Sequence, residues 1–387
     1  MTAFLGAILR YRPPVLFQSS RAFSTHELAN NLIHGDRVAL SRSITLVESS
    51  LAEHRVASEN LLDVVSREIS RRKSSIRIGI SGSPGVGKSS FIESIGGWLV
   101  SRGTKVAVLT IDPSSMQSGG SLLGDKTRME LLARHPLSFV RSTPTRGFLG
   151  GLSRSSDEAL TLCEGAGYDV TFVESVGIGQ SETALADVVD VFVLLIAPSA
   201  GDELQGMKKG VLEHADFIVI NKADGSLLKL SKETKHEFAL SVAMNRRKHS
   251  FWQPPLLLSS NRAPYDQNEP QGEPDTDSVL HPGQLWPLLT GFRDQLDRRG
   301  LIEKKKIANR IAWTDTEAVE LARDLFKNDP ELIAERQYLI QQLSAGSMSS
   351  RSAARHLVST LRGSGQRMPD RPTSRGQKKK QIPAKAQ

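Results

Sequence analysis

The sequence predicts an α/β fold in which a mostly parallel sheet carries helices on both faces. First, a glycine-rich loop at residues 82–89 lies between an alternating apolar run at 76–80 and a segment of helical spacing. Second, short apolar runs alternate with helical segments along the chain. Third, an acid or a polar motif directly follows several of these runs. The later predicted strands are residues 105–112, 137–141, 168–174, 188–197, 217–220 and 256–259.

The glycine-rich loop reads G-x-x-x-x-G-K-S, the pattern of a phosphate-binding P-loop. Its glycines let successive backbone N–H groups point inward, and the helix that begins near Lys88 adds the positive end of its dipole. Lys88 supplies a positive charge for the β- and γ-phosphates, and the Ser89 hydroxyl is placed to hold Mg²⁺. The pattern predicts a P-loop NTPase G-domain. The predicted phosphate-binding residues are Gly82, Ser83, Pro84, Gly85, Val86, Gly87, Lys88, Ser89 and Ser90.

Two acids near the second predicted strand are candidates for the metal site. The run 105–112 ends in Asp112, and Asp125 lies in the polar, Gly-rich loop that follows. Carboxylates at such a position hold the waters of a Mg²⁺ ion or orient the attacking water. A helix-capping Asp in an ordinary strand-to-helix loop is the alternative for this segment.

A third acid, Glu174, ends the run 168–174, and Gly177 follows three residues later. This is the layout of a γ-phosphate sensor, with Glu in place of the more familiar Asp. The predicted catalytic residues are therefore Lys88, Asp112, Asp125 and Glu174. The predicted metal ligands are Ser89, Asp112, Asp125 and Glu174.

The run 217–220 is followed by N-K-x-D, at residues 221–224. The Asp224 carboxylate accepts hydrogen bonds from both N1–H and the exocyclic amine of guanine. Adenine lacks this donor pair and leaves a buried acid unpaired, so the motif favours GTP over ATP. We expect Lys222 to pack its stem along the base plane and Asn221 to tie this segment to the P-loop.

The run 256–259 is predicted to be the last core strand. The segment after it is expected to close over the purine with backbone N–H groups, through Ser260, Asn261 and Arg262.

Helical segments flank the predicted core on both sides. Residues 27–47 and 48–70 are predicted to form two or three amphipathic helices with a break near Gly35, and residues 284–300 a further one. In the second segment, the spacing of the apolar residues suits a stripe packed on the next domain. The residues of this stripe are Leu51, Leu61, Leu62, Val65 and Ile69. Beyond Gly300 the pattern is helical to about residue 361.

This C-terminal helical segment carries more apolar positions than one helical hairpin buries easily, at Ile307, Ile311, Val319, Leu325, Leu339 and Leu343. We favour a dimerisation arm over packing on the core. The predicted division of the chain is a transit peptide (1–24), an N-terminal helical extension (25–74), a P-loop GTPase domain (75–300), a C-terminal dimerisation arm (301–362) and a disordered basic tail (363–387).

The formal net charge of +8 over 387 residues is concentrated at the two ends. Residues 1–26 contain three arginines and no acid, and residues 363–387 contain seven basic residues and one acid. The rest of the chain is close to neutral, which argues against a nucleic-acid-binding face. No apolar run approaches the roughly 18 residues that a membrane-spanning helix needs. We therefore predict neither nucleic acid nor a membrane as a partner.

Composition also bears on the compartment. Residues 1–24 are rich in Arg, Ser and apolar residues and contain no acid, which is typical of a mitochondrial transit peptide, so we expect the mitochondrial matrix. A disordered basic arm is the alternative. The single cysteine, Cys163, excludes an internal disulfide and is expected to be a packed core thiol. No His or Cys pair has metal-ligand spacing, so no structural zinc site is predicted.

Longer motifs surround the P-loop and N-K-x-D. They are D-P-S-S at 112–115, G-G-S-L-L-G-D-K-T-R-M at 119–129, C-E-G-A-G-Y-D at 163–169, E-S-V-G-I-G-Q-S-E at 174–182 and G-D-E-L-Q-G at 201–206. With these motifs the chain resembles the methylmalonic aciduria type A protein family and its bacterial counterparts, the GTPase chaperones of methylmalonyl-CoA mutase. The resemblance covers roughly residues 27–362. The acidic, Pro-rich segment after Arg262 and the basic tail depart from it.

The resemblance implies that GTP binding and hydrolysis, with GTP/GDP and Mg²⁺ as cofactors, gate the delivery of adenosylcobalamin to the mutase and protect the mutase from inactivation. It implies a homodimer, methylmalonyl-CoA mutase as partner, and as a further partner the adenosyltransferase that supplies the cofactor. It also implies that Asp202 and Lys208 belong to the switch that relays the nucleotide state to the mutase.

Two other functions use the same nucleotide machinery. A P-loop kinase would pass the phosphate to a small molecule or a protein, and the P-loop alone does not exclude it. A metal-inserting GTPase of another metalloenzyme would need His- or Cys-rich ligand clusters, which this chain lacks.

Overall fold

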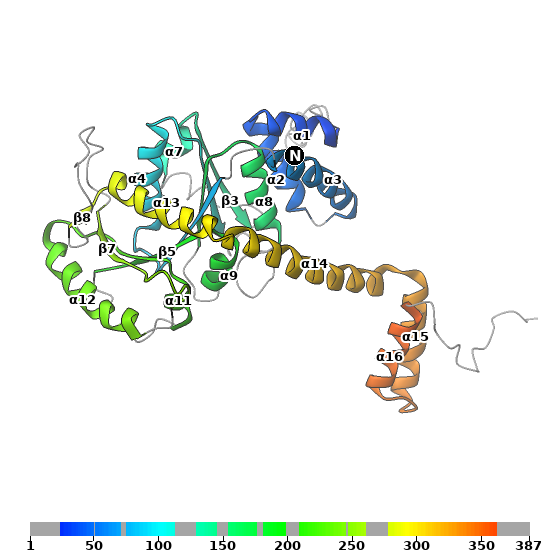
Figure 1. Cartoon of the computed structure of the whole chain (residues 1–387). Helices are drawn as coiled ribbons and strands as arrows, with labels where there is room; N and C mark the ends of the chain where they lie inside the picture. The colour runs from blue at the N-terminus through cyan, green and yellow to red at the C-terminus, as the bar shows by residue number, and fades with distance from the viewer. Residues whose placement is uncertain are drawn as a thin grey trace, which may run out of the picture. The chain divides into compact units, whose positions relative to one another are not determined.

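The computed structural model describes residues 24–49, 51–70, 75–112, 129–144, 154–175, 181–198, 209–244, 247–260 and 278–361. The chain divides into two compact units, Met1–Asn309 and Arg310–Gln387 (Figure 1). The boundary falls within helix α14 (Leu301–Asn328). The predicted transit peptide and basic tail lie outside the described residues. In the described segments, no helix is long and apolar enough to cross a membrane.

The first unit is built on one parallel sheet, in the order β3-β2-β4-β1-β5-β6-β7-β8. This arrangement confirms the predicted parallel α/β fold. The strands are β1 (Ile76–Gly82), β2 (Val106–Asp112), β3 (Ser138–Pro144), β4 (Val170–Glu174), β5 (Val191–Ile196), β6 (Phe217–Ile220), β7 (Leu256–Ser259) and β8 (Val279–Leu280).

Two strand predictions need correction. The run 256–259 is not the last strand, because β8 adds to it in parallel with Leu258 opposite Val279. With two residues, β8 is too short to show a strand pattern in the sequence. The run predicted from residue 188 becomes a strand only at Val191, since helix α9 (Ser181–Val188) occupies the residues before it.

Side chains on alternate residues of β1 face opposite layers of helices. Ile78 and Ile80 belong to the buried core shared with helices α4 (Lys88–Val100) and α13 (Pro282–Arg298). Gly79 faces α9, where an added Cβ would lie 2.9 Å from Leu185 Cγ, so glycine allows the helix to pack closely on the strand. Further described helices around the sheet are α7 (Glu130–Arg134), α8 (Arg154–Gly165), α11 (Lys209–His214) and α12 (Leu228–Met244), with the short η1 (Gly225–Leu227).

Among the described residues before β1 there are three helices, in agreement with the two or three predicted: α1 (Thr25–Ile33), α2 (Arg37–Val47) and α3 (Ala52–Ile69). Leu61 and Val65 are fully buried, and Val65 packs against Gly165 at the end of α8. Leu51 is 53% exposed and precedes α3, so its assignment to the apolar stripe is wrong. An ion pair of 2.6 Å between Glu48 Oε2 and Arg141 Nη2 ties the end of α2 to β3.

Cys163 is fully buried in α8, as a packed thiol should be. Burial raises the pKa of its thiol to about 12, so the reactive thiolate is scarce at neutral pH.

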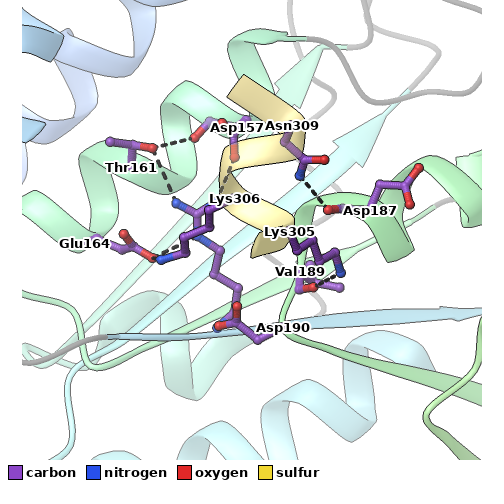
Figure 2. Close-up of polar contacts among 10 residues, drawn as sticks. Asp157, Thr161, Glu164, Asp187, Val189, Asp190, Lys305, Lys306 and Asn309 are labelled. Atoms are coloured by element: carbon purple, nitrogen blue, oxygen red, sulfur yellow. Dashed lines mark hydrogen bonds and ion pairs between the residues drawn. The ribbon is translucent and has the colours of Figure 1, made fainter. Parts of the chain in front are cut away.

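Charged groups of β1, α8 and α14 meet on the sheet face covered by α8 and α9 (Figure 2). Arg77 Nε lies 2.8 Å from Glu164 Oε1, and Arg77 Nη1 lies 2.7 Å from Asp157 Oδ1. The Arg77 backbone N–H donates to Asp190 Oδ2 at 2.9 Å, and Lys306 Nζ lies 3.7 Å from Glu164 Oε1. The desolvated guanidinium is thus paired with two carboxylates, which is the condition for burying a charge.

The start of α14 also holds the end of α9. Lys305 Nζ donates to the carbonyl oxygens of Ala186 and Val189, and Asn309 Nδ2 donates to that of Asp187 at 2.7 Å. Figure 2 shows Lys305 pointing toward Val189 and Asn309 pointing toward Asp187. The last carbonyls of a helix have no partner within the helix, so these side chains cap α9.

The described part of the second unit comprises the rest of α14 with α15 (Pro330–Ser344) and α16 (Ser350–Leu361). Asp329 caps α15, since its Oδ1 accepts from the N–H groups of Glu331 and Leu332. Leu332, Leu339 and Ala353 are buried in the chain. The structure therefore confirms the predicted helices. Much of the apolar surface stays exposed within one chain, at Ile311, Val319, Leu321, Leu325, Ile333, Ile340, Leu343 and Val358.

Candidate functional site

The candidate site lies along the carboxyl edge of the sheet. The P-loop follows β1, Glu174 ends β4, the N-K-x-D segment follows β6 and Ser260 follows β7. In a parallel sheet these ends share one edge, and β1 lies in the middle, between β4 and β5. Ligands of open α/β sheets bind in this place.

The P-loop backbone requires glycine where it leaves β1. Gly82 has φ +147°, and an added Cβ would lie 2.3 Å from the carbonyl oxygen of Leu195 on β5. Val86 is buried and anchors the loop, whereas Pro84 and Gly85 at its tip are exposed. The helix α4 then begins at Lys88, as the sequence predicts. An exposed loop at the N-terminus of a 13-residue helix is suited to hold an anion.

Lys88 is held across the loop. Its Nζ donates to the carbonyl oxygen of Gly82 at 2.8 Å and to that of Ser83 at 3.2 Å. The residue is only 8% exposed. A phosphate bound in the loop would neutralise this buried ammonium group, as the predicted phosphate role requires.

Ser89 and Glu174 come together from different elements. Ser89 Oγ, in the first turn of α4, donates to Glu174 Oε1 at the end of β4 at 2.9 Å. Hydroxyl and carboxylate oxygens are hard ligands of the kind that Mg²⁺ takes, together with substrate phosphates and water. Among the described residues no group of three His, Cys, Asp or Glu could hold a metal by itself. The pair therefore fits a Mg²⁺ ion that the nucleotide brings with it.

The segment after β6 is tied to the P-loop by two side chains. Asn221 Nδ2 donates to the carbonyl oxygen of Val86 at 2.9 Å, which is the tie that the sequence predicts. Lys222 has φ +60°, and its Nζ donates to the carbonyl oxygen of Gly85 at 2.6 Å. The lysine thus spans from the N-K-x-D segment to the loop tip, a contact that sequence reasoning missed because it pairs residues 137 positions apart.

Asp224 is oriented by the segment after β7. Ser260 Oγ donates to Asp224 Oδ2 at 2.5 Å, and the Ala223 N–H donates to the carbonyl oxygen of Ser259 at 2.9 Å. The two segments predicted to hold guanine are therefore joined directly. A carboxylate fixed in this way is suited to accept from two neighbouring N–H donors of a base.

Glu93, which the sequence analysis did not single out, links α4 to α7. Its Oε1 accepts from the Leu131 N–H at 2.6 Å and its Oε2 from the Leu132 N–H at 3.3 Å. Burial raises the pKa of this carboxyl group. The P-loop helix is thereby fixed to the helix that follows the segment containing Asp125.

Some predicted residues are not placed. Asp112 closes β2 at the expected edge, but its side chain is outside the described part of the chain. Four further predicted residues lie wholly outside the described residues: Asp125, Gly177, Asn261 and Arg262. The two residues of the candidate relay, Asp202 and Lys208, also lie outside them.

Comparison with known proteins gives consistent matches. A family model described as Methylmalonyl Co-A mutase-associated GTPase MeaB matches residues 40–331. The mitochondrial methylmalonic aciduria type A homolog of Mus musculus is 38% identical over 342 residues, which cover 87% of this chain and 79% of that protein. A probable GTPase of Mycobacterium tuberculosis is 39% identical over 331 residues, which cover 86% of this chain and 93% of that protein.

A solved structure is also similar. The crystal structure of a LAO/AO transport system kinase has a TM-score of 0.62 and 31% sequence identity, covering 89% of this chain and 100% of that one.

Proposed function

Because this chain belongs to the family of MeaB GTPases associated with methylmalonyl-CoA mutase, we propose that it is a GTP-hydrolysing chaperone of that mutase. In this proposal, nucleotide state gates the loading of adenosylcobalamin onto the mutase and protects the mutase from inactivation. The family match and the names of the relatives agree with the P-loop and N-K-x-D motifs on GTPase activity.

The observation that carries the proposal is the direct link between the phosphate and base segments. Asn221 and Lys222 bind the carbonyl oxygens of Val86 and Gly85, while Ser260 orients Asp224. One nucleotide therefore spans both segments, with its base read by Asp224 and its phosphates in the P-loop. Guanosine triphosphate is the ligand that these two linked segments fit best.

The chemistry assigned to these residues is positioning and charge neutralisation, without a covalent intermediate. Lys88 neutralises phosphate charge, and the Ser89 hydroxyl holds Mg²⁺, which when bound supplies Lewis-acid charge to the phosphates. Glu174, next to Ser89, orients the water that attacks the γ-phosphate or a water bound to the metal. Asp112 and Asp125 are proposed to join this acid set from the neighbouring segment.

Regulation by a partner follows from the family. Basal hydrolysis is proposed to be slow and to rise when the mutase binds, with Asp202 and Lys208 in the relay. The adenosyltransferase that supplies the cofactor is a further proposed partner.

The acid-free residues 1–24 support a transit peptide, and hence the mitochondrial matrix as the proposed location. The relatives in Mus musculus and Caenorhabditis elegans are named as mitochondrial.

A homodimer is proposed through the second unit. Its exposed apolar side chains include Val319 and Ile311, each 60% exposed, and Ile340, 50% exposed. Burying such side chains against a second copy removes apolar surface from water at about 25 cal/mol per Å². Sedimentation of the full chain is expected to give a dimer that Val319→Glu weakens; a monomer in the unmodified chain would refute this part.

The decisive experiment is capture of purified methylmalonyl-CoA mutase by the full chain in GTP and in GDP. We expect the amount captured to depend on the nucleotide and the dependence to vanish in Lys88→Ala. Lys229→Ala is the matched control, because Lys229 is exposed on α12 and 90% of its side chain is accessible. Absent or nucleotide-independent capture would refute the chaperone role.

Product analysis with labelled GTP and ATP tests the chemistry separately. Inorganic phosphate from GTP alone is expected. Label on an acceptor molecule would indicate a kinase, and equal hydrolysis of ATP would refute the role of Asp224.

A further inference from the structure

Two buried serines join the strand that enters the P-loop to the strand that ends in Glu174. Ser81 on β1 is 0% exposed and Ser175 directly after β4 is 1% exposed, and their hydroxyl oxygens lie 2.8 Å apart. Ser81 directly precedes Gly82, and Ser175 directly follows Glu174. We infer that this hydroxyl pair is a positioning element for GTP hydrolysis, which holds the sensor acid at a fixed place beside the P-loop.

The hydroxyl pair lies one residue beyond the last paired residues of β1 and β4, toward the candidate nucleotide site. In the parallel register of β1 and β4, Ile80 lies opposite Glu174, and the Ser175 N–H donates to the Ile80 carbonyl oxygen at 3.0 Å. One residue further on, β4 has ended and its backbone pairing with β1 stops, and the connection between the two segments passes to the hydroxyl groups. A side-chain hydrogen bond thus takes over at the point where the backbone pairing of β1 with β4 ends.

The residues next to the two serines in the sequence, Gly82 and Glu174, accept hydrogen bonds from side chains of the proposed phosphate site. Glu174 Oε1 accepts from Ser89 Oγ at 2.9 Å, and the Gly82 carbonyl oxygen accepts from Lys88 Nζ at 2.8 Å. The hydroxyl pair therefore sets the distance between the strand that carries the acid and the loop that carries the lysine. Because a misplacement of about 1 Å costs up to ~100-fold in rate, a loss of kcat of about tenfold is expected when the bond is removed.

Removing the hydrogen bond between the two serines should lower the rate of GTP hydrolysis and leave the affinity for the nucleotide unchanged. The base is assigned to Asp224, whose carboxylate accepts from Ser260 Oγ, whereas the two serine hydroxyls bond to each other. The P-loop backbone keeps its own anchors through Asn221 and Lys222. The inference rests on the proposed roles of Ser89 and Glu174, and it adds Ser81 and Ser175, for which no contact with nucleotide or metal is predicted.

The test measures kcat and KM for GTP and the affinity for GDP in the full chain. The variants are Ser175→Ala, Ser81→Ala and the double variant, with Ser175→Thr as the conservative variant that keeps the hydroxyl. The matched control is Ser58→Ala on α3, because Ser58 is also buried and also donates one hydroxyl hydrogen bond, to the Arg55 carbonyl oxygen at 2.7 Å.

We expect each alanine variant to lose about tenfold in kcat with KM and GDP affinity within about twofold of the unmodified chain. The double variant should lose no more than a single one, since both serines share one bond. Ser175→Thr and Ser58→Ala should keep kcat. Thermal unfolding of the alanine variants should match that of Ser58→Ala within about 5 °C, so that a fold defect is recognised.

Three results would overturn the inference. They are an unchanged kcat in both alanine variants, a change in KM as large as that in kcat, and a Ser175→Thr variant as slow as Ser175→Ala. Lys88→Ala in the same assay separates this inference from the proposed function. If Lys88→Ala abolishes hydrolysis while the serine variants keep kcat, only the positioning inference fails; if Lys88→Ala hydrolyses GTP at the full rate, the proposed function fails.

Discussion

Replacing Lys305 by Met should change how the stability of the first unit depends on pH. The Lys305 ammonium group lies inside the protein, although part of the side chain remains exposed, and it donates to the Ala186 and Val189 carbonyl oxygens at the end of α9. Desolvation, and then repulsion from Lys248, lower its pKa from 10.5 to about 8. Met keeps most of the stem volume and removes both the proton and the two hydrogen bonds.

The direction in which the unfolding free energy changes with pH follows from proton binding. Below pH 8 the lysine is charged in the folded and the unfolded chain, and the cost of burying the charge is fully present. Between pH 8 and 10.5 the unfolded chain binds a proton that the folded chain does not, so the free energy of unfolding rises with pH. At about 1.4 kcal/mol for each pH unit between the two pKa values, the rise is at most about 3 kcal/mol.

The substitution therefore has different effects on stability at the two ends of this pH range. Below pH 8, Met relieves about 3 kcal/mol of charge burial but leaves two helix-end carbonyl groups without their donor, at about 1–2 kcal/mol each, so the two effects nearly cancel and the variant should differ little from the unmodified chain. Toward pH 10 the relief disappears, and the variant should be less stable by about 2–3 kcal/mol.

The assay is guanidinium unfolding of the full chain at pH 7.5, 8.5 and 9.5, followed by far-ultraviolet circular dichroism. The difference in unfolding free energy between the unmodified chain and the Lys305→Met variant isolates this group from other lysines and tyrosines. Lys304→Met is the control, because Lys304 is exposed on the same turn of α14. A difference that is constant over this pH range would refute the reasoning.

Three further predictions concern single residues. Arg77→Met should lower the unfolding free energy by about 3–5 kcal/mol, since it leaves the buried Glu164 carboxylate and the partly exposed Asp157 carboxylate without their guanidinium; a loss below 1 kcal/mol in denaturant titration would contradict this. Gly82→Ala should abolish GTP binding in equilibrium titration, because its Cβ would meet the Leu195 carbonyl oxygen at 2.3 Å; retained affinity would show that the loop relaxes. Asp224→Ala should weaken GTP binding by about 2–3 kcal/mol and leave ATP binding unchanged; an equal loss for both would mean that the acid does not read the base.

The sequence by itself determined the local units of this protein. The alternating run of β1, the glycine spacing of the P-loop and the start of α4 at Lys88 form one continuous segment, and each depends on neighbours only a few residues away. The same holds for β6 and the N-K-x-D segment after it. Periods of 2 and 3.6 residues and fixed motif spacings are visible in a sequence because the contacts behind them are local.

The tertiary structure decided what depends on pairing between distant segments. The strand β8, the contact of Lys222 with Gly85, the bond between Ser81 and Ser175 and the burial of Lys305 all left no pattern in the sequence. The two serines are 94 positions apart, and nothing near either one shows that the parallel register places them side by side. Sheet register fixes such pairs, and it is set by the packing of the whole core, so a short stretch of sequence does not contain it.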